Sequence, residues 1–341
     1  MLTAGGDCPG LNAVIRAVTR RCLNGGHHVV GLRRGYLGLA ERMYEPLNMR
    51  TVSGILPLGG TLLSTSSYDP FRHPDGVERV KATFDEDDFD AVVAIGGEHT
   101  MSITRRLNDD VGLPMVGVPK TIDNDVPCTD FTFGFATAVQ VASDAIDRLH
   151  TTAQSHDRVM VIEVMGRNTG WIAVFSGIAG GADAIVIPEL ELTVEEICES
   201  INLRHERGKD FSIVVVAEGA ELAFASGEKR QVRTSEVTDQ YGYPRLGGIA
   251  IALGEEIESR TGFETRVTTL GHVQRGGTPT ASDRVLATRY GVKAAELVEK
   301  GEFGRMVALH GQEMTSVPLS EVTGLKRVDL SFLKLASTFF G

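Results

Sequence analysis

Short runs of apolar and β-branched residues alternate along the chain with longer, more polar stretches. The runs cover residues 28–32, 91–95, 115–118, 159–164, 184–187 and 212–217, and they end near a glycine or a carboxylate. Continuous apolar strands of this length are typical of parallel sheets that are covered by helices on both faces. We interpret the intervening stretches, such as 11–24, 137–153 and 194–207, as helices. The alternation predicts a doubly wound α/β protein.

The residues that follow each predicted strand are the first place to look for chemistry. Ligands of doubly wound sheets bind in the crevice at the carboxyl ends of the strands, and most of the unusual residues of this chain stand there. Two other parts carry less information. Residues 221–247 are polar without an apolar period, which indicates an exposed excursion between a strand and a helix. The chain after residue 312 is weakly patterned.

The length of the chain allows two α/β domains with separate cores, or one large domain. Of its 341 residues, 42% are hydrophobic and 23% are charged, as in ordinary soluble globular proteins. No apolar run reaches the roughly 18 residues of a membrane span. The nearest candidate, 171–187, is broken by glycines and an aspartate, and we interpret it as a buried helix that leads into a strand.

The start of the chain lacks a basic segment followed by an apolar core, so we expect no secretory signal. It begins close to its first motif, which suggests that an N-terminal strand is shortened. The four cysteines (Cys8, Cys22, Cys128 and Cys198) show no zinc spacing and fit a reducing cytoplasm. The net charge of −11 argues against nucleic-acid and membrane partners, so an anionic substrate would need a local group of cations.

The first motif with chemical meaning is TAGGDCPGLN, residues 3–12, which follows a short strand and opens a helix. Glycines let backbone N–H groups approach phosphates, and a helix N-terminus favours anions. An ordinary glycine turn is the alternative. The pattern GxxxxGK[ST] does not occur, which excludes a P-loop NTPase, and the absence of strict GxGxxG spacing disfavours a dinucleotide-dependent oxidoreductase.

Two further motifs follow predicted strands and carry carboxylates. In GGEHT, residues 96–100, Glu98 could hold a phosphate-bound magnesium ion, although a helix start capped by Thr100 explains the motif equally well. In PKTIDND, residues 119–125, Asp123 and Asp125 could converge on one metal or one hydroxyl. A carboxylate beside a sugar hydroxyl can accept its proton during attack on phosphorus. An Asx-turn cluster is the alternative here.

Cationic residues gather around the later predicted strands. Arg158 precedes the strand 159–164, and the segment MGR, residues 165–167, closes it. Glu218 ends another strand, and Arg266 precedes the segment GHVQRGG, residues 271–277. Guanidinium groups bind phosphate oxygens through two hydrogen bonds, and a glycine lets backbone come near a sugar. These cations supply the local anion site that the negative net charge requires.

Five segments in this order, GGDCPGLN, PKTIDND, HDRVMVIEVMGR, AEG and LGHVQRGG, strongly resemble the phosphofructokinase family, from Leu2 to about Ala295. The resemblance implies two Rossmann-like three-layer α/β/α domains with mainly parallel sheets and an active site in the cleft between them. A donor-binding domain would comprise residues 1–135 and about 275–325. A sugar-phosphate-binding domain would comprise residues 136–274 and the C-terminal segment. Mg²⁺ and a homo-oligomer, a dimer or commonly a tetramer with a shared sugar-phosphate site, are also implied.

The resemblance also implies a role for each matching position. Asp123 would accept the proton of the 1-hydroxyl of fructose 6-phosphate, Asp125 would assist at the metal, and Glu98 would hold Mg²⁺. Thr121 and Arg167 would complete the catalytic set. Residues for the sugar phosphate, some from a neighbouring subunit, would be Thr121, Ile122, Asp123, Arg158, Met165, Gly166, Arg167, Glu218, Arg266, His272, Val273, Gln274 and Arg275. Residues for the phosphoryl donor would be Gly6, Ser67, Tyr68, Gly97, Glu98, His99 and Thr100.

Two positions depart from the family pattern, and both bear on the donor. Members that use ATP typically have GGDG where this chain has GGEH, and members that use pyrophosphate typically have aspartate at the position of His99. Lys120 occurs in both branches. Ser67 stands where the family usually has an arginine that bridges the transferred phosphoryl group, and losing such a clamp weakens transition-state stabilisation. Arg72 and Lys120 are the candidates to replace it.

The sequence therefore favours transfer of a phosphoryl group from ATP to fructose 6-phosphate, giving fructose 1,6-bisphosphate as in glycolysis. Three alternatives stay open. Pyrophosphate could replace ATP, and sedoheptulose 7-phosphate could replace the acceptor. A weakly active or non-catalytic regulatory paralogue is suggested by Ser67 and His99, whereas the retained Asp123, Asp125 and Arg167 argue against it.

Overall fold

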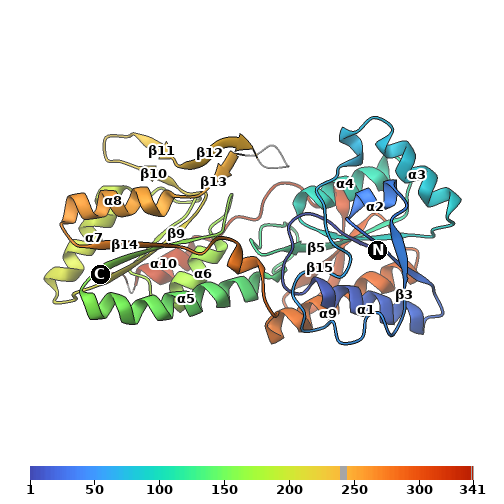
Figure 1. Cartoon of the computed structure of the whole chain (residues 1–341), viewed down its shortest axis with the longest axis horizontal. Coiled ribbons are helices and arrows are strands. Elements are labelled where there is room, and N and C mark those ends of the chain that lie inside the picture. The colour runs from blue at the N-terminus through green and yellow to red at the C-terminus, as the bar shows by residue number, and fades with distance from the viewer. Residues whose placement is uncertain (239–243, 339, 341) are drawn as a thin grey trace. The chain divides into compact units, whose positions relative to one another are not determined.

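The computed structural model describes residues 1–238, 244–338 and 340, and the chain divides into two compact units. The first unit comprises Met1–Thr137 and Arg275–Lys326, and the second comprises Ala138–Gln274 and Arg327–Gly341. Each unit has a mainly parallel sheet with helices on both faces, as Figure 1 shows. The predicted fold class is confirmed. The assignment of the donor to one unit and the sugar phosphate to the other stays a prediction.

The sheet of the first unit places the first motif at its centre. Its strand order is β16-β15-β5-β4-β1-β2-β3, with β6 paired to β5, and the two outermost pairs, β15–β16 and β2–β3, are antiparallel. The strands are β1 (Leu2–Thr3), β2 (Val29–Leu32), β3 (Tyr44–Leu47), β4 (Val92–Gly96), β5 (Met115–Thr121), β6 (Phe133–Gly134), β15 (Arg305–His310) and β16 (Glu313–Pro318).

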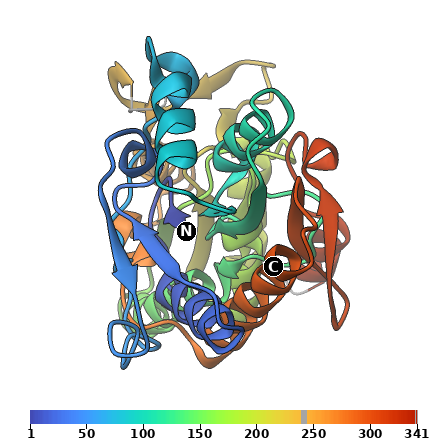
Figure 2. The ribbon, with the colours of Figure 1, turned by 90° about the vertical axis from the view of Figure 1, so that its right-hand side faces the viewer.

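Helices cover both faces of this sheet. They are α1 (Leu11–Asn24), α2 (Tyr36–Ala40), α3 (Gly76–Glu86), α4 (Glu98–Asp109) and α9 (Ala281–Glu299), with short 3₁₀ turns η1 (Pro70–Arg72) and η3 (Leu319–Glu321). Figure 2 shows α1 and α9 side by side below the sheet. They approach closely because Gly291 of α9 faces Ala17 of α1, where a Cβ on the glycine would lie 2.7 Å from the alanine Cβ. The apolar core on the other face includes Tyr36, Leu39 and Leu107.

The second unit is built on an all-parallel sheet of order β14-β7-β9-β8. Its strands are β7 (Val159–Val164), β8 (Ala184–Val186), β9 (Ser212–Ala217), β10 (Glu221–Ala223), β11 (Lys229–Gln231), β12 (Arg233–Thr238), β13 (Pro244–Leu246) and β14 (Thr265–Thr269). Its helices are α5 (Phe135–His156), which begins in the first unit, α6 (Trp171–Ala179), α7 (Val194–Glu206), α8 (Ile249–Thr261), α10 (Ser331–Ser337) and the 3₁₀ turn η2 (Gly271–Arg275).

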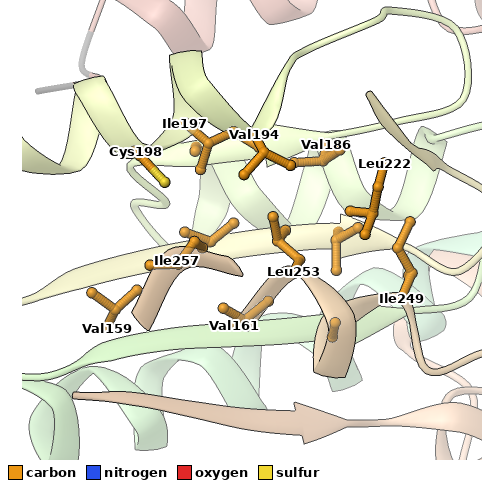
Figure 3. Packing of buried hydrophobic residues seen from close by; sticks show 14 of the residues in the cluster. Val159, Val161, Val186, Val194, Ile197, Cys198, Leu222, Ile249, Leu253 and Ile257 are labelled. Carbon is orange, nitrogen blue, oxygen red and sulfur yellow. The ribbon is translucent and has the colours of Figure 1, made fainter. Parts of the chain in front are cut away.

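The core of the second unit lies between its sheet and the helices α7 and α8. Figure 3 shows side chains of β7 facing Leu253 and Ile257 of α8, with Ile197 of α7 on the far side of the cluster. All residues of β7 and β9 are buried, as the continuous apolar runs predict for a sheet covered on both faces. α7 begins at Thr193, whose hydroxyl accepts the N–H of Glu196, while the Glu196 side chain returns to the Thr193 N–H.

Three parts of the chain differ from the sequence-based expectation. β5 extends through Thr121, so Lys120 and Thr121 lie on the strand and not after it. The stretch 221–247 contains two antiparallel ribbons, β10–β11 and β12–β13, and its residues 239–243 lie outside the described part. After residue 312 the chain forms β16 and α10; β16 is a half-exposed edge strand, so it has no continuous apolar run to identify it. Among the described residues, no helix has the length and hydrophobicity of a membrane span.

Candidate active site

The glycine motif and the carboxylate motifs meet at the carboxyl ends of the central strands of the first sheet. β1 pairs in parallel with β4 through Thr3 and Ile95, and β4 pairs with β5 through Gly96 and Pro119. The connections from β1 and β4 leave in opposite directions, which makes the β1–β4 boundary the topological switch point of the sheet. This is where doubly wound sheets bind their ligands.

The turn after β1 is held in shape by its neighbours. The N–H of Gly5 donates to the carbonyl of Ser66 at 3.1 Å, and the Thr65 hydroxyl donates to the carbonyl of Gly5 at 2.6 Å. The segment with Ser67 and Tyr68 therefore runs beside the glycine turn. Gly10, which precedes α1, has a φ of 109°, and a Cβ there would lie 2.8 Å from the Phe133 ring. Glycine is required at this position for both reasons.

Two cations lie against the turn. The Lys120 ammonium donates a hydrogen bond to the carbonyl of Gly6, and an Arg275 Nη1 atom lies 3.5 Å from the carbonyl of Asp7. A Cβ on Gly6 would lie 2.8 Å from the same Arg275 nitrogen. Lys120 is only 4% exposed, and this burial lowers the pKa of its ammonium. The turn thus combines a glycine backbone without side chains and neighbouring cationic side chains, and phosphate binding requires both.

The carboxylates of the site are electrostatically linked. The N–H of Asp123 donates to the Thr121 hydroxyl at 3.0 Å, and the same hydroxyl bonds the side chain of Asp125. Burial, followed by the charge of Asp123, raises the pKa of Asp125 to about 7, and Glu98 adds a smaller effect in the same direction. Asp123 also contributes to the potential at Lys120. Asp123, Asp125 and Glu98 therefore share one part of the first unit.

The carboxylates of this site could supply some, but not all, of the ligands of a Mg²⁺ ion. Asp125 is buried beside the charge of Asp123, with a smaller effect from Glu98, and a hard cation with oxygen ligands would stabilise these carboxylates. Within the described residues, however, no three acidic, histidine or cysteine side chains are arranged to hold an ion by themselves. This agrees with the usual behaviour of Mg²⁺, which takes one or two carboxylates and completes its shell with phosphate oxygens and water.

A second group of predicted residues lies at the carboxyl ends of β7 and β9. The N–H of Glu218 donates to the carbonyl of Val164 at 2.9 Å, and that of Gly219 donates to the carbonyl of Gly166 at 3.1 Å. A side chain at Gly219 would overlap the carbonyl of Arg167. The fully buried Gln274 side chain accepts the N–H of Met165 at 3.4 Å.

Arg158 and Arg266 lie elsewhere in the second unit. Arg158 precedes β7, and Arg266 pairs with Met160 near the start of that strand. Both guanidinium groups bond the carboxylate of Glu264, Arg158 through Nε at 2.6 Å. β7 has six residues, which makes it about 20 Å long. The two arginines are thus separated from Met165, Gly166 and Arg167 by the length of the strand.

The remaining predicted residues fall into two classes. Ile122 is fully buried and Thr100 is 4% exposed, with the Thr100 carbonyl accepting the Thr104 hydroxyl at 2.7 Å. These two side chains are packed inside the protein next to the first site. His272 and Val273 are exposed on η2, Val273 to 61%. Gly97 separates β4 from α4, and a Cβ there would lie 3.4 Å from the carbonyl of Lys120.

Comparison with known proteins identifies this arrangement. Residues 1–298 match the family model described as "Phosphofructokinase".

The chain belongs to the phosphofructokinase family. A "Pyrophosphate--fructose 6-phosphate 1-phosphotransferase" from Streptomyces coelicolor is 50% identical over 343 residues, which cover 100% of this chain and 99% of the relative. An "ATP-dependent 6-phosphofructokinase 3" from the same organism is 51% identical over 335 residues, covering 96% and 95%. Identity alone does not separate the two donors.

A solved phosphofructokinase confirms the fold. The structure of phosphofructokinase from Saccharomyces cerevisiae superposes with a TM-score of 0.79 at 30% identity. The match covers 99% of this chain and 44% of the yeast chain, so this chain spans less than half of that protein.

His99, which the sequence predicts to bear on the choice of donor, has a partner that the sequence did not indicate. Its Nε2 lies 3.5 Å from Oδ2 of Asp69, a carboxylate that is 6% exposed. The other oxygen of Asp69 accepts the N–H of Phe71 at 2.9 Å, and Arg72 lies 3.4 Å from Oδ2. Asp69 is therefore in contact with the imidazole of the residue that follows Glu98. The only sequence signal for Asp69 is an Asp-Pro pair, which predicts a turn and not a site.

Proposed function

We propose that this phosphofructokinase family member transfers the terminal phosphoryl group of ATP to the 1-hydroxyl of fructose 6-phosphate. The observation that carries the proposal is the clustering of Asp123, Asp125 and Glu98 beside a glycine turn that is flanked by Lys120 and Arg275. A base and a phosphate-binding turn side by side are the parts that phosphoryl transfer needs.

In the proposed reaction Asp123 accepts the proton of the attacking hydroxyl. Its backbone N–H is fixed by the Thr121 hydroxyl, which orients the carboxylate after the end of β5. Lys120, together with Arg275, which the resemblance assigns to the sugar phosphate, places positive charge next to the turn where the donor phosphates would bind. Phosphoryl transfer requires little covalent chemistry from the protein, so positioning and charge neutralisation supply most of the acceleration.

Mg²⁺ belongs to the proposal as a metal shared between donor and protein. Glu98 would be its protein ligand, and Asp125 would contribute through its position beside Asp123. When bound, Mg²⁺ neutralises charge on the donor phosphates and orients them.

The sugar phosphate is proposed to bind the second group of residues, with Arg167, Gly166 and Met165 around the sugar. Glu218 and Gln274 contact the same backbone segment, which supports a shared role. Arg158, Arg266 and His272 would bind the phosphate of a sugar in a neighbouring copy of the chain. We therefore propose a homo-oligomer, a dimer or tetramer, and a reducing cytoplasm as its compartment, which suits the four free thiols.

Pyrophosphate is the second candidate donor. His99 supports this candidate, because an imidazole beside Glu98 and within 3.5 Å of Asp69 would crowd the α-phosphate of a nucleotide bound there. The similarity to a relative named for pyrophosphate is consistent with this candidate.

An assay of the purified protein with each donor and each sugar tests the proposal. ATP and pyrophosphate would be combined in turn with fructose 6-phosphate and sedoheptulose 7-phosphate, with Mg²⁺ present. We expect turnover with ATP and fructose 6-phosphate. Turnover with pyrophosphate but not with ATP would establish pyrophosphate as the donor. Binding of fructose 6-phosphate, measured by calorimetry, without turnover with any donor would establish a regulatory paralogue.

A further inference from the structure

The loop that follows the catalytic strand closes on itself behind the two aspartates. The hydroxyl of Thr132 donates to the carbonyl of Thr121 at 2.8 Å, which joins the two ends of the loop. Asn124 stands between Asp123 and Asp125, is fully buried and has a φ of 51°. A non-glycine residue in this conformation needs support from its surroundings.

Part of that support comes from a lysine about 200 positions later in the chain. The ammonium of Lys326 donates to Oδ1 of Asn124 at 2.9 Å, to the carbonyl of Thr129 at 2.9 Å and to the carbonyl of Asp130 at 2.7 Å. An ammonium has three N–H donors, and these three oxygens can satisfy all of them. We call Asn124 Oδ1 and the two carbonyl oxygens the oxygen cradle.

A fourth contact reaches the aspartate turn itself. The backbone N–H of Lys326 donates to the carbonyl of Asp125 at 2.9 Å. The side chain of Lys326 thus holds the Asn124 side chain, and its backbone holds the carbonyl of the next residue, Asp125. Asn124 also accepts the N–H of Thr132 at 3.0 Å, so the amide that Lys326 bonds is the one that ties the loop together.

The far end of the loop is anchored independently. The hydroxyls of Thr129 and Tyr290 are 2.6 Å apart, and Thr129 Oγ1 accepts the N–H of Leu309 at 3.0 Å. The carboxylate of Asp130 accepts the N–H of Gly311 at 2.6 Å. Because these contacts do not involve Lys326, removing its ammonium would loosen the aspartate turn and leave the rest of the loop attached.

We propose that Lys326 is a positioning residue of phosphoryl transfer, whose ammonium fills the oxygen cradle and fixes the turn that carries Asp123 and Asp125. The proposal rests on the proposed function, in which Asp123 is the base. Burial lowers the pKa of the Lys326 ammonium to about 8, while the carboxylates of Asp130 and Asp125 raise it, so the group is protonated at pH 7.

The test compares Lys326→Met, which keeps the length and removes the donors, with Lys326→Arg, which keeps charge and donors. Lys334→Met is the matched control, because that lysine is exposed on α10. With the full-length protein at saturating donor, kcat per folded site should fall about 10- to 100-fold in Lys326→Met, as expected for displacement of a base by about 1 Å. KM for fructose 6-phosphate should change less than about threefold, since the sugar contacts lie mainly in the second unit.

Lys326→Arg should recover part of the lost kcat. An unchanged kcat in Lys326→Met, an equal fall in Lys334→Met, or an Arg variant no better than the Met variant would each overturn the proposal. If Lys326→Met does not fold, Lys326→Gln, which retains a donor of shorter reach, takes its place under the same criteria.

A readout without substrates separates this proposal from the proposed function. Hydrogen exchange of the backbone amides of residues 122–132 should be faster in Lys326→Met than in the unmodified protein, with exchange in α10 unchanged. Unchanged exchange of these amides would overturn the positioning role even if activity fell. A wild-type protein that is inactive with every donor would refute the proposed function, while the exchange result would still decide whether Lys326 fixes the turn.

Discussion

The two aspartates of the PKTIDND motif, Asp123 and Asp125, have different surroundings. Asp123 is held by a backbone hydrogen bond to Thr121, whereas burial and neighbouring charge raise the pKa of Asp125 to about 7. A base must be ionised at the working pH to accept a proton. Burial and the charge of Asp123 work against the ionisation of Asp125, so Asp125 is poorly suited to act as the base and its charged form would be stabilised by a bound cation.

The first prediction concerns the base. Asp123→Ser should lower kcat by about 10³-fold or more, because general-base catalysis and the orientation of the hydroxyl are both lost. Binding of fructose 6-phosphate, measured by calorimetry, should stay within a few-fold of the original. Asp90→Ser, at an exposed position before β4, is the control and should leave kcat unchanged. Near-normal turnover in Asp123→Ser would remove Asp123 from its role.

The second prediction concerns stability and pH. Burial, followed by the charge of Asp123, raises the pKa of Asp125 from its ordinary value of 3.8 to about 7, so the folded state binds the proton more tightly. Its stabilising effect is complete below pH 3.8 and is lost as the pH rises through 7. In protein without divalent metal, Asp125→Asn should therefore raise the free energy of unfolding at pH 8 by about 1–3 kcal/mol, and by less than about half as much at pH 5. Equal effects at both pH values in thermal unfolding would contradict this.

The third prediction concerns the choice of donor. His99→Gly removes the imidazole that Asp69 holds next to Glu98. We expect kcat/KM for ATP to rise relative to that for pyrophosphate by about tenfold, equivalent to about 1.4 kcal/mol of differential transition-state binding. His27→Gly, at an exposed position after α1, should leave the ratio unchanged. A fall in the ratio would show that His99 supports the nucleotide.

At the residue scale, the sequence predicted the motif residues of the site better than the distant residues that contact them. Asp123, Asp125 and Glu98 stand in short segments directly at strand ends, so their meeting follows from the topology of the sheet. Asp69 and Lys326 reach the site through long-range contacts, and nothing in their local sequence differs from an ordinary turn aspartate or surface lysine. Only the three-dimensional structure reveals that such residues lie near the site.

At the scale of elements, apolar runs identified the central strands β4, β5, β7 and β9, but they missed β15, although its residues 306–309 are buried. β7 and β9 have the predicted bounds because every residue in them is buried. The period-free ribbon β12–β13 and the edge strand β16 were not predicted, because their pairing and not a buried face defines them.

One contact between elements explains how α5 can begin where it does. The carboxylate of Asp283, at the start of α9, accepts the N–H of Thr137 at 2.7 Å and its hydroxyl at 2.5 Å, and Asp283 is 1% exposed. This supplies the acceptor that the first turn of α5 requires.

The fourth prediction therefore concerns Asp283. Asp283→Ala should lower the free energy of unfolding by about 2–3 kcal/mol, because a buried N–H loses a charged acceptor. Asp85→Ala is the control, since the exposed pair with Lys81 on α3 is worth less than about 0.5 kcal/mol. Chemical denaturation of both variants measures the difference, and equal losses would show that the cap is not stabilising.

At the scale of the whole molecule, two mainly parallel sheets each carry predicted site residues at the carboxyl ends of their strands. This arrangement could be predicted, because it follows from the alternation of strands and helices and from the places where the motifs stand. The separation of Arg158 from residues 165–167 also follows from the sequence, because the two flank the strand 159–164. The place of Arg266 near the start of β7 could not be predicted, since only the register of β14 against β7 reveals it.

That separation leads to the last prediction, which concerns sharing of sites between copies of the chain. If Arg266 of one copy serves the sugar phosphate bound by another, a mixture of the Asp123→Ser and Arg266→Ala variants contains hybrids in which one site has both native residues. In randomly assembled symmetric dimers half of the molecules are hybrids with one intact site of two, so about a quarter of the original activity should return. Each variant alone should remain nearly inactive. Activity in the co-refolded mixture that equals the mean of the separate variants would mean that each chain completes its own site, and that Arg266 acts on its own copy or not at all.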